Sequence, residues 1–279
     1  MNDLQDKVAF ITGAGSKRGI GHAVAIRLAQ GGYNVALTDK YEAPTSLFAD
    51  DKKWRGLPEI VEEIRALGRE ALSIVADVID GTAIDNAVAK TIEKYGKIDV
   101  LVNCAGTIGK RDTPVVELSL SDWMIPVTTN LTGSFLVAKA VSREMIKRKQ
   151  GKILMVSSIA GRKGNAQLAG YSASKFGVIG LVQSLALELA PYNINVNAIC
   201  PGPIVTNLRD LWLVHKAAET STDVEAARHN FLKKKANEIP LGRLGEASEV
   251  AELVFFLVSE RASFITGQSY NICGGSQLD

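Results

Sequence analysis

The chain has few residues suited to disulfide or metal chemistry, with three cysteines and three histidines among 279 residues. Cys104, Cys200 and Cys273 are odd in number and include no CxxC pair, so we expect reduced interior thiols and no disulfide framework. The histidines are scattered without the spacing of metal ligands, and we therefore expect no metal site.

Long apolar runs and charge of one sign are also absent. The longest apolar helical patch, 250–258, is too short to cross a bilayer, and the first residues contain no apolar segment with a cleavage site. The 32 basic and 30 acidic residues leave a net charge of +2, which gives no field for nucleic acid or acidic membranes. We expect a cytoplasmic protein that acts on a small molecule and contacts neither nucleic acid nor membrane.

Short apolar runs and longer helical patterns alternate along the whole chain. The runs are rich in Val and Ile without strict alternation, as is typical of parallel strands covered on both faces. The expected strands are 8–12, 34–38, 71–75, 99–103, 152–157, 194–199 and 269–273; the helical patterns lie near 20–31, 58–68, 82–95, 121–149, 171–190 and 247–258. This order predicts an α/β fold: a single doubly wound domain, 1–279, with a seven-stranded, mostly parallel sheet and helices on both faces.

Two stretches look like additions to this alternation. Residues 41–57 follow the second expected strand and contain two aromatics, a proline and mixed charges. Residues 207–240 follow a proline-rich turn at the end of a strand, the edge where open α/β sheets bind ligands. We predict that 207–240 is a substrate lid; a structural or assembly role is the alternative.

A glycine-rich turn follows the first expected strand. In TGAGSKRGIG, Gly13, Gly15, Gly19 and Gly21 lie between a strand and a helix, where glycine permits close approach to a ligand. The helix start that follows would favour a pyrophosphate. The strict GxGxxG pattern is absent, so a plain tight turn is the alternative interpretation.

Asp39 ends the second expected strand, where a carboxylate can bind the hydroxyls of an adenosine ribose. It would also repel a 2′-phosphate and thus favours NAD over NADP. Lys17 and Arg18 favour NADP instead, because cations near the ribose could bind that phosphate. We predict NAD, with NADP possible; a solvated turn carboxylate is the alternative for Asp39.

Tyr171 and Lys175 lie four residues apart in YSASK, so they share one face of a helix about one turn apart. An ammonium beside a phenol favours the phenolate and should lower the tyrosine pKa toward neutrality. Such a phenol can exchange a proton with an alcohol oxygen. Ser158 precedes the pair by thirteen residues. Alone, the pair could be an ordinary surface pair.

These blocks together resemble the short-chain dehydrogenase/reductase family over nearly the full length of the chain. The glycine turn is similar to its TGxxxGxG, NCAG at 103–106 to its NNAG, and Asn130 in TTNLTG joins Ser158, Tyr171 and Lys175 as its catalytic tetrad. The resemblance implies a Rossmann-type fold and a homotetramer. The cofactor residues that it implies are Gly13, Arg18, Gly19, Ile20, Asp39, Asp77, Val78, Asn103, Ala105, Gly106, Tyr171, Lys175, Pro201, Gly202, Ile204 and Thr206.

The chain departs from the family pattern in two places. Its glycine turn carries two additional residues, so individual phosphate contacts cannot be transferred, and Cys104 replaces the second Asn of NNAG. The additional length at 41–57 could cover the adenosine or alter the choice of cofactor.

The resemblance implies hydride transfer between nicotinamide and a carbonyl carbon. Tyr171 would exchange the proton, Lys175 would lower the tyrosine pKa and hold the nicotinamide ribose, Ser158 would donate a hydrogen bond to the substrate oxygen, and Asn130 would hold a relay water.

The main interpretation is an NAD(H)-dependent oxidoreductase for a secondary alcohol or ketone, with a polyol or sugar as one candidate substrate. The alternatives are an NADPH-dependent 3-oxoacyl-thioester reductase and, in another class, a non-catalytic dinucleotide-binding sensor or scaffold.

Four residues are candidates for substrate contact: Ala160, Asn165, Gln167 and Trp212. The amides of Asn165 and Gln167 could bind hydroxyl groups, which favours a polyol, or could satisfy only backbone groups.

Overall fold

The computed structural model describes residues 7–44, 51, 53–219 and 223–278, without the side chains of 209, 211, 215 and 216. Parts of the two predicted additions, residues 45–50, 52 and 220–222, lie outside the described residues.

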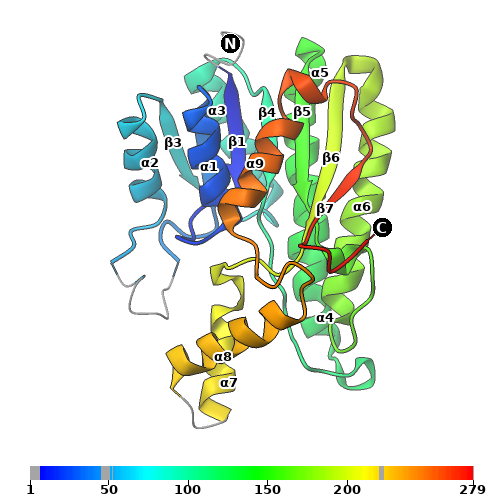
Figure 1. Ribbon diagram of the computed structural model, residues 1–279. Coiled ribbons are helices and arrows are strands. Elements are labelled where there is room, and N and C mark those ends of the chain that lie inside the picture. The colour runs from blue at the N-terminus through cyan, green and yellow to red at the C-terminus, as the bar shows by residue number, and fades with distance from the viewer. Residues whose placement is uncertain (1–6, 45–50, 52, 220–222, 279) are drawn as a thin grey trace.

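Seven parallel strands form one sheet, in the order β3-β2-β1-β4-β5-β6-β7 (Figure 1). The strands are β1 (Val8–Thr12), β2 (Asn34–Asp39), β3 (Ala71–Val75), β4 (Val100–Asn103), β5 (Gly151–Val156), β6 (Ile194–Pro201) and β7 (Ser269–Ile272). This confirms the predicted fold class, and the sheet is fully rather than mostly parallel.

Helices cover both faces of the sheet. The α-helices are α1 (Ile20–Gln30), α2 (Leu57–Ala66), α3 (Gly81–Tyr95), α4 (Leu120–Pro126), α5 (Gly133–Arg148), α6 (Ala169–Leu189), α7 (Asp210–Glu219), α8 (Val224–Asn237) and α9 (Ala247–Leu257). The short helices are η2 (Val115–Glu117), η3 (Val127–Thr132), η4 (Ile159–Gly161), η5 (Ala190–Tyr192), η6 (Asn207–Arg209) and η7 (Glu260–Ala262).

Neighbouring residues of a strand enter opposite hydrophobic cores. In β1, Ile11 packs in the core formed with α1, α2 and α9, whereas Phe10 packs in the core formed with α3, α5 and α6. Both side chains are fully buried. Burial on both faces explains why the strands show continuous apolar runs rather than alternation.

The helical pattern at 121–149 is interrupted by a π-helical turn, η3, between α4 and α5. Pro126 ends α4; its ring removes a backbone donor and crowds the preceding turn, so the regular ladder cannot continue. The sequence interpretation placed Asn130 in one long helix, but the residue lies within this π-helical turn. Single π-helical turns are frequent at functional sites.

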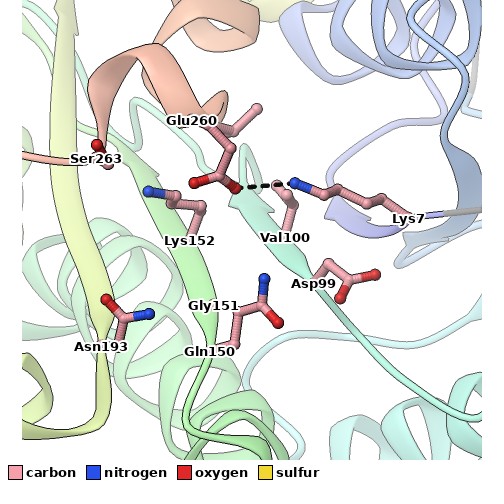
Figure 2. A pocket seen from close by; sticks show the side chains of 10 residues that line it. Lys7, Asp99, Val100, Gln150, Gly151, Lys152, Asn193, Glu260 and Ser263 are labelled. Atoms are coloured by element: carbon pink, nitrogen blue, oxygen red, sulfur yellow. Dashed lines mark hydrogen bonds and ion pairs between the residues drawn. The ribbon is translucent and has the colours of Figure 1, made fainter. Parts of the chain in front are cut away.

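A polar crevice lies at the amino edge of the sheet, where β4 and β5 begin (Figure 2). Lys7 and Glu260 form an ion pair across it at 2.9 Å. The buried carboxylate of Asp99 accepts a hydrogen bond from Val8 N at 2.8 Å and from Arg148 Nη2 at 2.8 Å. These contacts join the starts of strands, so the crevice serves the fold and lies away from the carboxyl edge where the predicted site residues gather.

Candidate active site

The sheet order reverses direction between β1 and β4, and the turns after these two strands meet at their carboxyl ends. Gly13 has a φ of 66°, and a Cβ there would lie 2.6 Å from backbone atoms of Ala105. Only glycine permits this approach. The first glycine of the turn and the NCAG segment therefore form the two walls of a topological switch point, where α/β sheets bind ligands.

The N-terminus of α1 has the features of an anion-binding site. Its N-cap, Gly19, contributes no side-chain hydrogen bond, and the first turn contains no acidic residue. The N–H groups of that turn thus keep the capacity to bind a phosphate. A Cβ at Gly21 would lie 2.4 Å from Gly13 O, so helix and turn pack closely. These residues fit the pyrophosphate of a dinucleotide.

Asp39 lies at the end of β2, beside the glycine turn. Its Oδ2 accepts a hydrogen bond from Gly15 N at 2.8 Å. Burial raises the pKa of this carboxyl, and the Gly15 N–H opposes the rise. The carboxylate is therefore placed where an adenosine ribose would lie next to the turn.

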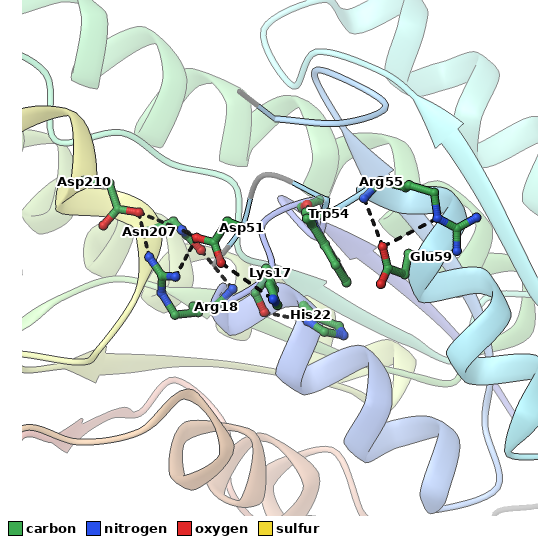
Figure 3. Close-up of polar contacts among 10 residues, drawn as sticks. Lys17, Arg18, His22, Asp51, Trp54, Arg55, Glu59, Asn207 and Asp210 are labelled. Carbon is green, nitrogen blue, oxygen red and sulfur yellow. Dashed lines mark hydrogen bonds and ion pairs between the residues drawn. The ribbon is translucent and has the colours of Figure 1, made fainter. Parts of the chain in front are cut away.

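Arg18 in the glycine turn contacts residues of both predicted additions, 41–57 and 207–240 (Figure 3). Arg18 Nη1 contacts Asp51 Oδ2 at 2.5 Å, and Arg18 Nη2 contacts Asp210 Oδ2 at 2.9 Å. Asn207 Nδ2 donates to the same two carboxylate oxygens at 2.9 and 2.7 Å, and its Oδ1 accepts from Arg18 N. We call Arg18, Asp51, Asn207 and Asp210 the polar latch. It connects the phosphate turn, the 41–57 segment and the 207–240 segment.

Trp54 fastens the 41–57 segment a second time. Its Nε1 donates to Gly15 O at 2.7 Å, and its ring lies 5.1 Å from that of His22 on α1 (Figure 3). His22 Nε2 in turn contacts Glu63 Oε2 of α2 at 2.6 Å. Trp54 thus lies against the glycine turn and the start of α1.

Asp77 and Val78, which the family resemblance places beside the adenine, follow β3. Asp77 Oδ2 pairs with Lys40 Nζ at 3.1 Å, and Val78 is buried against Gly133. Both contacts fix the loop after β3 at the carboxyl edge.

The turn after β6 holds the residues that the family resemblance places beside the nicotinamide. Pro201 ends the strand, Gly202 N donates to Ile272 O at 2.9 Å, and Ile204 forms a bridge with Gly245. Thr206 is the N-cap of η6 without a side-chain capping bond.

Lys175 and Tyr171 lie on α6, with the lysine Nζ 5.9 Å from the centroid of the tyrosine ring. The Nζ donates to Val156 O at 2.8 Å and is buried. A Cβ at Gly106 would lie 3.5 Å from this Nζ and 3.1 Å from Asn130 Oδ1. The structure therefore brings three predicted residues together beside the topological switch point: Gly106, Asn130 and Lys175.

Asn130 is held by the backbone of Thr107, which directly follows the NCAG segment, and by α6. Its Oδ1 accepts from Thr107 N at 2.8 Å, and its Nδ2 donates to Thr107 O and Ser174 Oγ, both at 2.9 Å. All its described bonds are to protein groups. The assignment of Asn130 to a water relay stays a prediction.

Ser158 follows β5 and has its side chain at the boundary of burial, 9% exposed. Its Oγ accepts from Ala160 N at 3.1 Å, which leaves the hydroxyl proton available to a substrate oxygen. A Cβ at Gly161 would lie 2.7 Å from Lys175 O, so the serine segment packs directly on the catalytic helix.

The predicted substrate residues fall into two groups. Ala160 is buried beside Ser158, and Trp212 of α7 donates through Nε1 to Asp112 Oδ2 at 2.8 Å. Asn165 and Gln167 are exposed in the loop before α6. Asn165 Nδ2 donates only weakly, to Lys163 O at 3.4 Å.

Burial lowers the pKa of Lys175 from 10.5 to about 8. Holding the buried ammonium therefore costs about 3 kcal/mol near pH 7, while its bond to Val156 O returns about 1 kcal/mol. We expect Lys175→Met to unfold at higher urea than the wild type near pH 7 and to be inactive. The cost is complete below the folded pKa and disappears as pH rises toward the unfolded value, so the gain should shrink by more than half near pH 9.5.

Urea titrations of both proteins at the two pH values measure this gap, with exposed Lys139→Met as the matched control. A gap that is absent near pH 7, or that stays constant with pH, would contradict the account of a desolvated ammonium.

Several residues of this site were not found from the sequence: Asp51, Trp54, Asn207 and Asp210 around the glycine turn, and Arg111 in the loop after β4. The position of Arg111 after a strand end was a usable signal, whereas the others needed the spatial arrangement.

Comparison with known proteins agrees with this geometry. The family described as Enoyl-(Acyl carrier protein) reductase matches residues 13–277. The 3-oxoacyl-[acyl-carrier-protein] reductase of Synechocystis sp. is 39% identical over 276 residues, covering 99% of this chain and 98% of the relative. The chain belongs to the short-chain dehydrogenase/reductase family. It is an NAD(P)-dependent oxidoreductase acting on CH–OH or keto groups.

Solved structures of the family show the same fold with different substrates. An actinorhodin polyketide ketoreductase variant with NADPH has 36% identity and a TM-score of 0.85, with 99% of both chains covered. NAD+-bound xylitol dehydrogenase has 34% identity and a TM-score of 0.83, covering 98% of this chain and all of the other. Both forms of the dinucleotide thus occur among the family's similar structures.

One described helix, Ala169–Tyr192, is long and apolar enough to cross a membrane by length and composition. It carries Tyr171 and Lys175, and its buried residues pack with α3, α5 and the sheet in one hydrophobic core.

Proposed function

We propose that this short-chain dehydrogenase/reductase transfers a hydride reversibly between NAD(H) and C3 of a 3-oxoacyl or 3-hydroxyacyl compound. The observation that carries the reaction is the buried Lys175 ammonium beside Tyr171 at the switch point. The name of the Synechocystis relative supports a 3-oxoacyl substrate and favours the alternative interpretation of the sequence over a polyol.

The dinucleotide supplies or accepts the hydride when it is bound, and the protein manages the proton and the charge. In reduction, Tyr171 gives its phenolic proton to the carbonyl oxygen, and Ser158 donates a hydrogen bond to the same oxygen. Lys175 stabilises the phenolate that remains. In oxidation, Tyr171 accepts the alcohol proton.

Two groups at the turn support NAD(H) over NADP(H). The Asp39 carboxylate lies against Gly15, where it would bind ribose hydroxyls and repel a 2′-phosphate. Of the two cations that could bind such a phosphate, Arg18 pairs with Asp51 and Asp210, and Lys17 Nζ lies 3.9 Å from Asp51 Oδ1.

We expect Asp39→Asn to lower the ratio of kcat/KM for NADH to that for NADPH by about 10- to 100-fold, because a repelling charge beside the 2′-phosphate is removed. The exposed Asp85→Asn on α3 is the control. Steady-state reduction of a 3-oxobutanoyl thioester, followed by the absorbance of reduced nicotinamide, measures both ratios. An unchanged ratio in Asp39→Asn contradicts the assignment of Asp39.

The same assay tests the substrate, with xylitol and a neutral secondary alcohol as competitors. Turnover of xylitol with no turnover of 3-oxoacyl compounds would restore the polyol interpretation. Dinucleotide binding with no turnover at all would support the sensor or scaffold alternative.

We also propose that the protein is a cytoplasmic homo-oligomer, a tetramer by family resemblance. Apolar side chains are exposed along α4, α5 and α6: Leu120, Phe135, Phe176 and Leu187. Light scattering on the purified protein measures the assembly.

A further inference from the structure

The loop after β4 brings an arginine to the reaction centre. A Cβ at Gly109 in this loop would lie 2.8 Å from the ring of Pro126, and one at Gly170, directly before Tyr171, would lie 3.1 Å from the same ring. Pro126 thus holds the loop and the start of the catalytic helix together. Arg111 follows two residues beyond Gly109; burial lowers the pKa of its guanidinium, and the neighbouring Asp112 and Tyr171 oppose that fall.

The Arg111 guanidinium is held against the lid segment. It stacks on Trp212 of α7, with its central carbon 4.5 Å from the ring centroid. The neighbouring Asp112 accepts a hydrogen bond from Trp212 Nε1 at 2.8 Å, and adopts a left-handed φ of 54° to do so. Strained backbone of this kind costs free energy, and it is concentrated at functional sites.

This cation has unused hydrogen-bonding capacity. Its buried Nε has no hydrogen-bond partner among the described residues. The nearest carboxylate, Asp112, also accepts the tryptophan N–H. A guanidinium presents its donors in a planar fork that matches the two oxygens of a carboxylate. Desolvating such a group without a strong acceptor is unfavourable, so a ligand oxygen would stabilise it.

We propose that Arg111 binds a carboxylate of the substrate, so that the enzyme acts on a free 3-oxo or 3-hydroxy acid in preference to its ester, amide or thioester. This inference rests on the proposed function. The carboxylate takes no part in the bond changes: C3 loses or gains the hydride, and Tyr171 exchanges the proton of its oxygen. Trp212 and Asp112 act as positioning residues for the guanidinium.

The test compares 3-hydroxybutanoate with its uncharged methyl ester and its thioester, as substrates for the full chain with NAD+. The wild type should prefer the acid. Arg111→Gln should lower kcat/KM for the acid by about 10- to 100-fold, the loss of one charge-assisted contact, and leave the ester unchanged. Arg111→Lys should recover part of the loss. Exposed Arg143→Gln on α5 controls for a general loss of positive charge.

Inhibition by butanoate, which cannot be oxidised at C3 because it lacks the hydroxyl, gives a reading that is independent of hydride transfer. Its inhibition constant against the methyl ester should rise in Arg111→Gln by the same factor.

An equal loss for acid and ester, or a wild type that prefers the ester or thioester, overturns the carboxylate inference and leaves the proposed function intact. No turnover of acid, ester or thioester with either dinucleotide overturns both.

Discussion

Replacing Tyr171 by Phe should lower kcat in both directions by about 10²- to 10⁴-fold, the usual contribution of a general acid/base. The variant loses only the hydroxyl that would exchange the proton, while the aromatic ring is retained. The dissociation constant for NADH should change little, because the turn after β1 and the start of α1 hold the pyrophosphate. Steady-state kinetics and fluorescence titration of NADH measure the two quantities separately.

Tyr192→Phe is the matched control, since Tyr192 lies in η5 at the far end of the α6 region and packs with its aliphatic neighbours. It should retain full activity. Activity in Tyr171→Phe equal to that of this control would remove Tyr171 from the mechanism. A parallel loss of NADH binding would instead indicate that the phenol serves the cofactor site.

The sheet could be predicted because both of its faces are buried. The run Val8–Thr12 is apolar at its first four positions and buried at all five, and this distinguishes a doubly covered parallel strand from an edge or a surface strand. Tyr171 and Lys175 could be proposed as an acid/base pair from the sequence because their interval is one helical turn, and the structure places both on α6. Features that depend on the spacing of neighbouring residues can therefore be predicted from the sequence.

The π-helical turn at Asn130 shows where local patterns are insufficient. The apolar periodicity of 121–149 continues through Pro126, so the pattern alone indicates one helix. The interruption follows from the missing N–H of the proline and from the bonds that Asn130 makes to Thr107 and Ser174. Such bonds depend on neighbours from other elements.

The polar latch could not be predicted for the same reason. Arg18 is 33 residues from Asp51 and 192 from Asp210, and no periodicity links such distant charges. From the sequence alone, Arg18 was a candidate to bind the 2′-phosphate of NADP, because its position in the glycine turn was visible and its carboxylate partners were not. The structure pairs it with two carboxylates, and this favours NAD(H) without any change in the motif.

We expect Arg18→Met to destabilise the protein by about 3 to 5 kcal/mol near neutral pH, the cost of removing one partner from a buried ionic group. Asp51 and Asp210, 3% and 7% exposed, would then share the Asn207 amide without the cation between them. The other cations that face them are Lys17, 3.9 Å from Asp51, and Arg228, which acts on Asp210. The affinity for NADH should fall as well, since the latch fixes the phosphate turn.

The pH dependence separates this effect from simple loss of packing. Burial raises the pKa of Asp210 and Arg18 opposes that rise, so removing Arg18 raises the pKa of Asp210 further above its unfolded value. The deficit in the free energy of unfolding is then complete above the raised pKa and shrinks as pH falls toward the unfolded value. Urea titrations near pH 7.5 and pH 5 measure this deficit.

Adding Asp51→Asn to Arg18→Met should restore most of the stability near pH 7.5. The control Arg55→Met, which breaks an exposed ion pair with α2, should leave the urea midpoint unchanged. A deficit that is independent of pH and is not rescued by Asp51→Asn would show that Arg18 contributes packing rather than charge.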